Sequence, residues 1–401
     1  MKTRRLFKED VYQKNARAVI TDLIPSEKGL IAVLNQTIFF PEGGGQSSDI
    51  GTIGTLTVTH VYEEKDHIYH CCVEKESTLS IGDEVDISID WQHRFDNMQR
   101  HCGEHILSGK FFELFGGVNR GFHMGDDYMT IDISLEENPA YDKVTWEMAK
   151  EAELATNEVI WQNLPVITRH FDDRAEAEHL PLRKALAFDE DITIVCVGNV
   201  ENPADCVACC GTHPSTAGQV GMLKIYKVEV NKGMYRIYFE AGQRAFRQYQ
   251  DRFDVLTTLE NKLSAGTADL LDKFTSQQEK NKGVRDELYH LKKWIISRET
   301  EDIKAQIAPA FVRKYDKLSI NDILDIGRNL TGCIPTIAFL VHQPSNTVLL
   351  FSDKHDCGKL VKENAHIYGG KGGGNKTSAR AIFSKADYVD TFIDLIEKHL
   401  R

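Results

Sequence analysis

The segment Met98-Gln-Arg-His-Cys-Gly-Glu-His-Ile-Leu-Ser108 carries two histidines, His101 and His105, four positions apart. The pattern around it is helical from Asp90 to Phe115, with apolar residues recurring near one stripe between positions 95 and 114, and Gly116-Gly117 ends the helix. Residues i and i+4 share one face of a helix, so both imidazoles can reach one metal ion. Inward histidines also occur as hydrogen-bonded core residues. The segment alone therefore predicts a helix with half of a candidate metal site.

The other half of such a site lies in Cys206-Val-Ala-Cys-Cys-Gly-Thr-His213. Zinc binds four ligands drawn from histidine, cysteine and carboxylate, so His213 and one cysteine would complete the set. Cys206, Cys209 and Cys210 all have suitable spacings, and spacing does not choose among them. The chain has 9 cysteines, an odd number with three crowded beside a histidine, which favours a reducing compartment and metal ligation over a disulfide framework.

Composition limits the class of protein. The 401 residues are 41% hydrophobic and 27% charged, as in soluble globular proteins with two or three domains. No apolar run has the length of a membrane span, and the first residues lack the apolar core of a signal peptide, so we expect a cytoplasmic protein without a membrane partner. The net charge of -12 argues against non-specific coating of nucleic acid, but it allows a local basic surface.

The chain is predicted to be α+β, with a β domain over residues 1–89. Its short apolar and alternating runs indicate a small antiparallel sheet or barrel. The segment Phe39-Phe-Pro-Glu-Gly-Gly-Gly-Gln46 interrupts these runs. It is either a wide turn between strands or a loop that lets a ligand or RNA lie against backbone amides, in which case Gly44, Gly45 and Gln46 are contact residues.

Three further regions follow the β domain. Residues 90–243 are predicted to pack the histidine helix on one sheet with strands at 128–133, 192–197, 221–228 and 235–240 and a helix at 145–162. Residues 244–300 form two helical patterns with a break near Gly266, which favours a helical hairpin that positions the last domain or mediates a homodimer. Residues 301–401 have an α/β pattern with strands at 336–341 and 347–351.

The last region contains His366-Ile-Tyr-Gly-Gly-Lys-Gly-Gly-Gly-Asn-Lys376. Its backbone amides and lysines could cradle phosphates, and the spacing is not that of a nucleotide-binding P-loop. The candidate RNA contacts are Gly370, Lys371, Gly372, Gly373 and Gly374.

These motifs together resemble a known family. His101-x-x-x-His105, Cys209-Cys-Gly-Thr-His213 with Thr216-x-Gly218-x-x-Gly221, and the glycine loop at 39–46 resemble the editing region of alanyl-tRNA synthetases. The likeness is closer still to the free-standing alanyl-tRNA editing proteins of the AlaX type. Gly242-Gln-Arg-Ala245 matches the pattern that ends the editing domain, and residues 366–376 resemble the glycine-rich motif of the DHHA1-type tRNA-binding domain.

The resemblance implies a function and a ligand set. The ligands of Zn²⁺ would be His101, His105, Cys209 and His213, although this chain has Cys210 where glycine is usual and Pro214 where a branched apolar residue is usual. Too few residues precede the histidine helix for a class II aminoacylation core. The expected activity is therefore trans-editing: hydrolysis of the ester that joins serine or glycine to mischarged tRNA(Ala).

Roles for other residues follow from the same resemblance. An open zinc position would admit water or the substrate, and Glu104 would accept a proton or orient the water, unless it is a surface carboxylate. The family places a substrate-selecting group after the histidine helix, where this chain has Asn119, Arg120, His123 and Thr130; the last two are the predicted contacts. A non-catalytic tRNA-binding protein with structural zinc is the alternative. A phosphoesterase is disfavoured, since the sequence has no Asp-His-His cluster.

Overall fold

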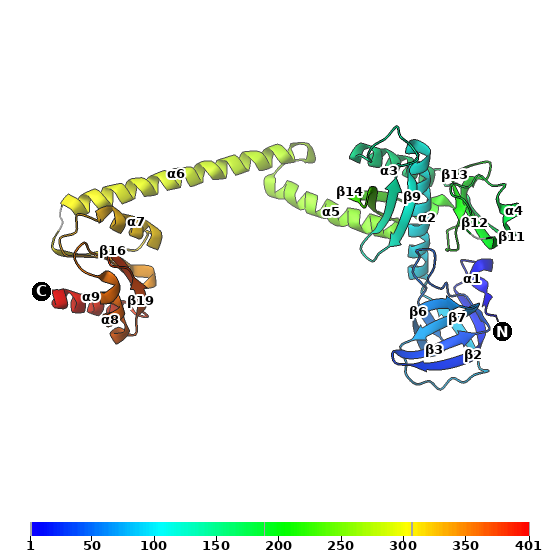
Figure 1. Cartoon of the computed structure of the whole chain (residues 1–401), viewed down its shortest axis with the longest axis horizontal. Coiled ribbons are helices and arrows are strands. Elements are labelled where there is room, and N and C mark those ends of the chain that lie inside the picture. The colour runs from blue at the N-terminus through cyan, green and yellow to red at the C-terminus, as the bar shows by residue number, and fades with distance from the viewer. Residues whose placement is uncertain (1, 188, 306–307, 401) are drawn as a thin grey trace. The chain divides into compact units, whose positions relative to one another are not determined.

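The computed structural model describes residues 2–187, 189–305 and 308–400. The chain divides into two compact units, with the boundary between Thr258 and Leu259. Both units mix helices with sheets, which confirms the predicted α+β class (Figure 1). Within the described ranges, no helix combines the length and the apolar character needed to cross a bilayer.

The first unit begins with a closed barrel. Its strands follow the order β2 (Asn15–Ser26), β3 (Gly29–Leu34), β7 (His67–Cys72), β6 (Leu56–Glu64), β5 (Gly51–Ile53) and β8 (Glu84–Ile89). Alternating residues of β8, Val85, Ile87 and Ile89, point into the barrel core. The sequence left a sheet and a barrel open, and the barrel closes because β8 pairs with both β2 and β5.

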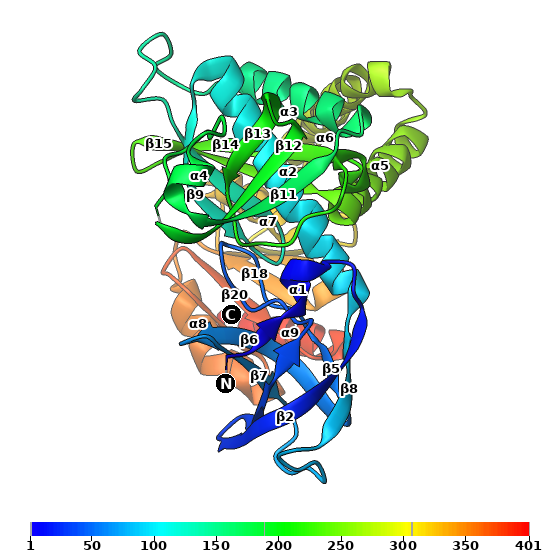
Figure 2. The ribbon, with the colours of Figure 1, turned by 90° about the vertical axis from the view of Figure 1, so that its right-hand side faces the viewer.

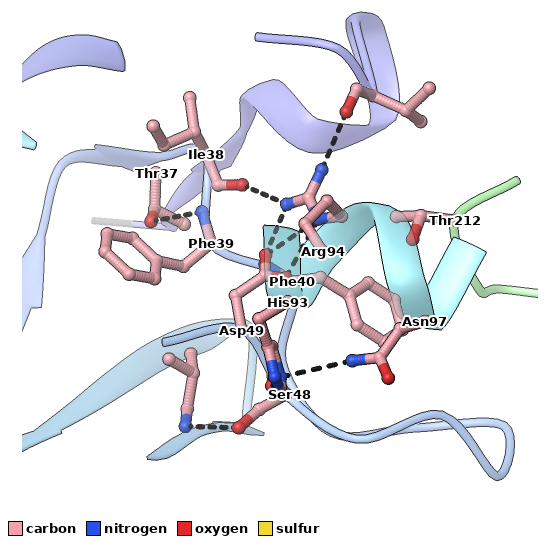
Figure 3. A network of polar contacts seen from close by, with 12 residues as sticks. Thr37, Ile38, Phe39, Phe40, Ser48, Asp49, His93, Arg94, Asn97 and Thr212 are labelled. Atoms are coloured by element: carbon pink, nitrogen blue, oxygen red, sulfur yellow. Dashed lines mark hydrogen bonds and ion pairs between the residues drawn. The ribbon is translucent and has the colours of Figure 1, made fainter. Parts of the chain in front are cut away.

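Helix α2 (Trp91–Phe115) carries the two histidines and leaves the barrel directly after β8. The side chain of Asp90 caps its first turn by accepting a hydrogen bond from the His93 backbone, and Gly116 ends it with a φ of 63°. These limits match the helix expected at 90–115. Arg94 ties the helix to the barrel: its guanidinium donates to the Asp49 carboxylate and to the Val11 and Ile38 carbonyls (Figure 3).

Above the barrel, α2 packs with α3 (Trp146–Trp161) on a four-stranded sheet of order β14-β15-β10-β9. The bounds are β9 (Val118–Met124), β10 (Met129–Ser134), β14 (Leu223–Asn231) and β15 (Met234–Ala241). Between the helices and the sheet lies a core that includes Phe111, Ile131 and Phe239. The strand expected at 128–133 and the helix expected at 145–162 are present within a few residues.

One strand was assigned to the wrong sheet. The segment at 192–197 belongs to β12 (Glu190–Asn199), which pairs with β11 (Val166–Asp173) and β13 (Asn202–Ala208) in a separate three-stranded sheet. Short elements extend this part of the unit, namely β1 (Arg4–Arg5), α1 (Leu6–Glu9), β4 (Gln36–Thr37), α4 (Arg174–Ala177) and η1 (Ala217–Val220). Helix α1 lies between the barrel and the β11–β13 sheet (Figure 2), where Lys8 pairs with Asp191.

Helix α5 (Gly242–Leu263) crosses the boundary of the two units, and α6 (Leu270–Ala305) begins after η2 (Thr267–Asp269). The break expected near Gly266 is present. Packing of the two helices as a hairpin stays a prediction.

The second unit contains a five-stranded sheet of order β16-β17-β18-β20-β19. Its elements are β16 (Ala310–Tyr315), α7 (Ile320–Leu330), β17 (Ile337–His342), η3 (Gln343–Ser345), β18 (Thr347–Phe351), α8 (Cys357–Asn364), η4 (Ala365–Tyr368), β19 (Lys371–Gly374), β20 (Ser378–Ile382) and α9 (Ala386–Leu400). Alternate residues of β17 face opposite layers: Phe339 packs toward α8 and α9, and Leu340 toward α6 and α7. The strands expected at 336–341 and 347–351 are β17 and β18.

Candidate metal centre

Four side chains of the first unit converge on one point. The ligand atoms of His101, His105, Cys209 and His213 lie within 4.8 Å of one another. The Cys209 sulfur is 3.5 Å from His101 Nε2 and 3.8 Å from His213 Nε2, and the Nε2 atoms of His105 and His213 are 3.3 Å apart. One thiolate and three imidazoles in so small a volume form a donor set that suits a tetrahedral transition metal.

Two elements bring these ligands together. His101 and His105 lie on successive turns of α2, and both are buried. Cys209 follows the last residue of β13, and its backbone N–H donates to the Thr193 carbonyl of β12 at 2.9 Å. The β12–β13 register therefore sets where the ligand loop begins.

Spacing did not decide which of the three cysteines is the metal ligand, and the structure places them in different environments. Cys209 lies in the cluster. Cys206 sits opposite Cys196 on the neighbouring strand and is bonded to it, contrary to the expectation that these cysteines serve metal ligation rather than disulfides. Cys210 is exposed and turns toward the glycine loop, where its sulfur would be 3.0 Å from a side-chain carbon added at Gly44.

The charges around Cys209 favour its thiolate form, which is the form that binds a metal. Burial alone would raise the pKa of Cys209, but the neighbouring His101, His213 and His105 outweigh burial and hold the pKa well below its usual value. Burial lowers the pKa of His213 to about 4. The pKa of His105 rises to about 10 although burial opposes it, because Cys209 and Asp205 favour the charged ring. A metal ion would displace the His105 proton on binding.

Residues outside the cluster orient its imidazoles. The Gln46 Oε1 atom accepts a hydrogen bond from His101 Nδ1 at 2.9 Å and one from the Thr212 backbone at 3.0 Å. The Gln46 amide also donates to the Thr212 hydroxyl at 2.8 Å. His105 Nδ1 lies 3.2 Å from Asp205 Oδ2, and Asp205 is held by Arg183. Partners at both Nδ1 atoms leave the Nε2 atoms to face the cluster.

The sequence predicted Gln46 as a site residue but did not point to Asp205. Gln46 is fully buried and contacts His101, while its predicted contact with a ligand stays a prediction. Asp205 was missed, because its distance along the chain from His105 carries no periodic signal.

Glu104 is not a surface carboxylate, which was one of the two interpretations that the sequence allowed. It is 5% exposed, and its Oε1 atom accepts hydrogen bonds from the Ser108 hydroxyl at 2.6 Å and from the Asn119 amide at 2.8 Å. Both bonds use the same oxygen, so Oε2 keeps its capacity to accept a proton or a hydrogen bond. Glu104 lines the cavity beside the cluster, together with Asn119.

A cavity of about 570 Å³ opens onto the cluster. His101, His105 and Cys209 line its floor, and Gly44 and Phe122 lie in its wall. Its charged residues are the cations Arg5, Lys8, Arg120, Arg183 and Lys184 and the carboxylates Glu42, Glu63, Glu104 and Asp191. Metal ligands, a free carboxylate oxygen and cations around one cavity can bind a polar, anionic molecule.

Besides Gln46, three residues predicted as substrate contacts do not line this cavity. Gly45 has a φ of 82° and packs against Phe122, 2.6 Å from the position of an added side-chain carbon. His123 is exposed, and Thr130 is buried opposite it in the β9–β10 ladder. Both lie beyond the part of β9 that the cavity reaches, residues 119–122.

The glycines predicted to contact RNA lie in the second unit. Residues 371–374 form β19, an exposed strand at the edge of the sheet that pairs with β20. Gly372, Gly373 and Gly374 line a hollow with Lys359, Lys362 and Lys376. Gly370 precedes the strand and packs against Phe383, and Lys371 is exposed.

Comparison with known proteins agrees with the geometry. Residues 7–93 match the family described as tRNA synthetases class II (A), and residues 192–238 match the threonyl and alanyl tRNA synthetase second additional domain. The second match contains two residues of the cluster, Cys209 and His213. The fold and site thus resemble the editing-related parts of these synthetases.

Individual relatives sharpen the likeness. The chain is 27% identical to the alanyl-tRNA editing protein AlaX-L of Pyrococcus horikoshii, across 99% of both chains. It is 28% identical to the alanyl-tRNA editing protein Aarsd1 of Mus musculus, across 87% of this chain and 83% of the relative. The alanine–tRNA ligase of Pyrococcus abyssi is 28% identical across 99% of this chain but only 44% of the ligase. The resemblance to alanyl-tRNA editing proteins is confirmed.

Proposed function

We propose that this protein is an aminoacyl-tRNA deacylase that hydrolyses the ester of mischarged tRNA(Ala) in trans, with serine or glycine as the wrong amino acid. The observation that carries the proposal is the cluster of His101, His105, Cys209 and His213, of which the first three line a cavity. Relatives named alanyl-tRNA editing proteins that match along nearly their whole length support it.

The cluster fits Zn²⁺, because three imidazoles and a thiolate are ligands that zinc prefers. A bound zinc ion would supply Lewis-acid chemistry at the ester or its attacking water. Gln46 and Asp205 keep the Nε2 atoms of His101 and His105 turned toward that ion. Glu104 holds a free oxygen at the cavity, where it accepts a proton from water or a hydrogen bond from the substrate.

The serine selector would lie on the cavity wall. A site that hydrogen-bonds the serine hydroxyl leaves a buried polar group unpaired when alanine binds, which disfavours the correct aminoacyl-tRNA. Glu104 of α2 and Asn119 of β9 are polar side chains that line this cavity and lie outside the metal cluster. We therefore assign discrimination to them rather than to His123 and Thr130.

The second unit would hold the body of the tRNA through β19, as a DHHA1-like domain. Its exposed glycine backbone and the lysines around it, Lys359, Lys362, Lys371 and Lys376, support this assignment. A homodimer through α5, α6 or this unit is part of the proposal.

The test is deacylation of Ser-tRNA(Ala), Gly-tRNA(Ala) and Ala-tRNA(Ala), with zinc content measured on the same samples. Wild type should hydrolyse a mischarged species but not Ala-tRNA(Ala). His105→Ala and Cys209→Ala should lose zinc and activity, while Cys210→Ala, a change at the adjacent residue outside the cluster, should keep both. Tight tRNA(Ala) binding with bound zinc and no hydrolysis would overturn the proposal in favour of a non-catalytic tRNA-binding protein.

A further inference from the structure

Most cations around the cavity are already neutralised. Arg5 and Lys8 pair with Asp191, Arg183 pairs with Asp205, and Arg120 pairs with Glu137. Lys184 lines the same cavity, and among the described residues no carboxylate or hydrogen-bond acceptor contacts its ammonium group. Within the described part of the chain, Lys184 is therefore a cation of this cavity that has no acidic partner and can bind an external anion.

The surroundings of Lys184 favour an anion. The side chain is half-buried, and burial, followed by the charge of Arg183, lowers its pKa, with a smaller contribution from Arg120. Glu104 and Asp205 oppose this shift without contacting the ammonium group. A lysine desolvated beside two guanidinium groups gains more from an anionic partner than an exposed lysine would.

The position of Lys184 is fixed relative to the cluster. The backbone N–H of Arg183 donates to the Cys206 carbonyl at 2.8 Å, and the Arg183 side chain holds Asp205, the residue that contacts His105. The same strand, β13, ends immediately before Cys209. Lys184 thus stands at a set distance from the metal ligands. Arg120 can join it, because its pair with Glu137 is exposed, with 46% and 60% of the two side chains accessible, and such pairs are weak.

We propose that Lys184, with Arg120 beside it, forms a phosphate subsite that binds the sugar-phosphate backbone at the 3′ end of the acylated tRNA. This inference rests on the proposed function, because the ester lies on the 3′-terminal ribose and places the last phosphates of the strand near the mouth of the cavity. The subsite positions the ester over the cluster, so Lys184 is a positioning residue and takes no part in the bond-breaking step.

The first test measures binding of uncharged tRNA(Ala) over a series of salt concentrations. Each phosphate contact to a single strand contributes about 0.7 to the slope of log K against log salt, so Lys184→Met should lower the slope by about that amount. Lys184→Arg should restore it. Lys110→Met is the matched control: Lys110 is also largely buried in the first unit but already pairs with Glu113, and its slope should equal that of wild type.

The second test is deacylation of Ser-tRNA(Ala) by the same variants, with melting temperatures to confirm folding. Loss of one charge-assisted hydrogen bond should raise KM about tenfold for Lys184→Met and leave kcat unchanged. An unchanged KM and slope, or a fall in kcat alone, would overturn the subsite. If wild type binds tRNA(Ala) but hydrolyses nothing, the proposed function fails, and the binding slopes alone then decide on the subsite.

Discussion

Residues 43–45 and 372–374 are both runs of three glycines, yet they differ in backbone conformation and in the burial of the residues that flank them. In the first run, Gly44 and Gly45 take left-handed φ angles of 59° and 82°, and paired backbone hydrogen bonds between Gly43 and Gln46 close the turn. In the second run, the glycines are extended in an exposed edge strand. The first run places the buried side chain of Gln46 beside the metal cluster, and the second leaves its backbone exposed beside lysines.

The difference shows that the residues around a glycine run, rather than the glycines, determine its role. The first run lies between Phe40 and Gln46, both buried, and the Phe40 N–H donates to Asp49 at 2.6 Å. The second is followed by Asn375 and Lys376, which are exposed. A buried flank turns a flexible segment into part of the scaffold, whereas an exposed flank leaves it available for a partner.

The strongest way to break the comparison is to remove the buried anchor of the first run. Asp49 and Arg94 contact each other (Figure 3), and both side chains are fully buried, so Asp49→Ala leaves an uncompensated buried charge. We expect the free energy of unfolding to fall by about 3–5 kcal/mol, measured by denaturant unfolding. Asp390→Ala is the control, because its pair with Lys314 in the second unit is exposed and should contribute less than about 1 kcal/mol. Equal effects would contradict the comparison.

Acid should weaken the first unit through His70. Burial lowers its pKa to about 4, although the contact between Nδ1 and the Ala32 carbonyl, at 3.0 Å, opposes this shift. Its Nε2 lies 2.8 Å from the Thr37 hydroxyl. The unfolded state binds more protons between pH 6.5 and 4, so this stability is complete above 6.5 and is lost as the pH falls toward 4. The loss is about 3 kcal/mol.

Unfolding measured at pH 7 and pH 5 would check the acid effect. His70→Asn should lessen the pH dependence in that window, whereas the same change at the partly exposed His67 should leave it as in wild type. A pH dependence of unfolding unchanged by His70→Asn would show that other groups cause the acid sensitivity.

The role of Gln46 can be sharpened with Gln46→Ala. The variant removes the hydrogen bond that orients His101 and two bonds to Thr212. Loss of such a partner typically costs 10- to 100-fold in metal affinity, so we expect a drop of about that size, measured by competition with a zinc chelator. Lys371→Ala, directly before the second run, should leave zinc affinity unchanged and weaken tRNA binding instead. Unaltered zinc affinity in Gln46→Ala would show that Gln46 does not support the metal ligands.

The smallest expected effect comes from the glycines. Gly45→Ala forces a left-handed alanine and brings its side chain within 2.6 Å of Phe122, which should destabilise the first unit by about 1–2 kcal/mol. Gly373→Ala meets nothing within 4 Å and needs no left-handed backbone, so it should be neutral or stabilise by up to about 1 kcal/mol. Thermal unfolding compares the stability of the two variants. Similar losses of stability would show that the two glycine runs do not differ in their tolerance of a side chain.

The sequence by itself determined the elements whose signals are local. The histidine helix, the strands at 128–133 and 347–351 and the break near Gly266 all follow from residue spacing within a short window, since apolar periodicity and capping residues report the local backbone. The i, i+4 spacing also determined that His101 and His105 share a face. The motifs together sufficed to reveal the likeness to alanyl-tRNA editing proteins.

Only the tertiary structure decided the questions that depend on contacts between distant segments. The β12–β13 register puts Cys206 opposite Cys196 and leaves Cys209 for the cluster. The packing of α2 buries Glu104 at the cavity, and the closed turn at 43–46 sends Gln46 to His101. The physical reason is the same in each case: hydrogen bonds and burial join residues far apart in the chain, and no periodic pattern records which partners meet.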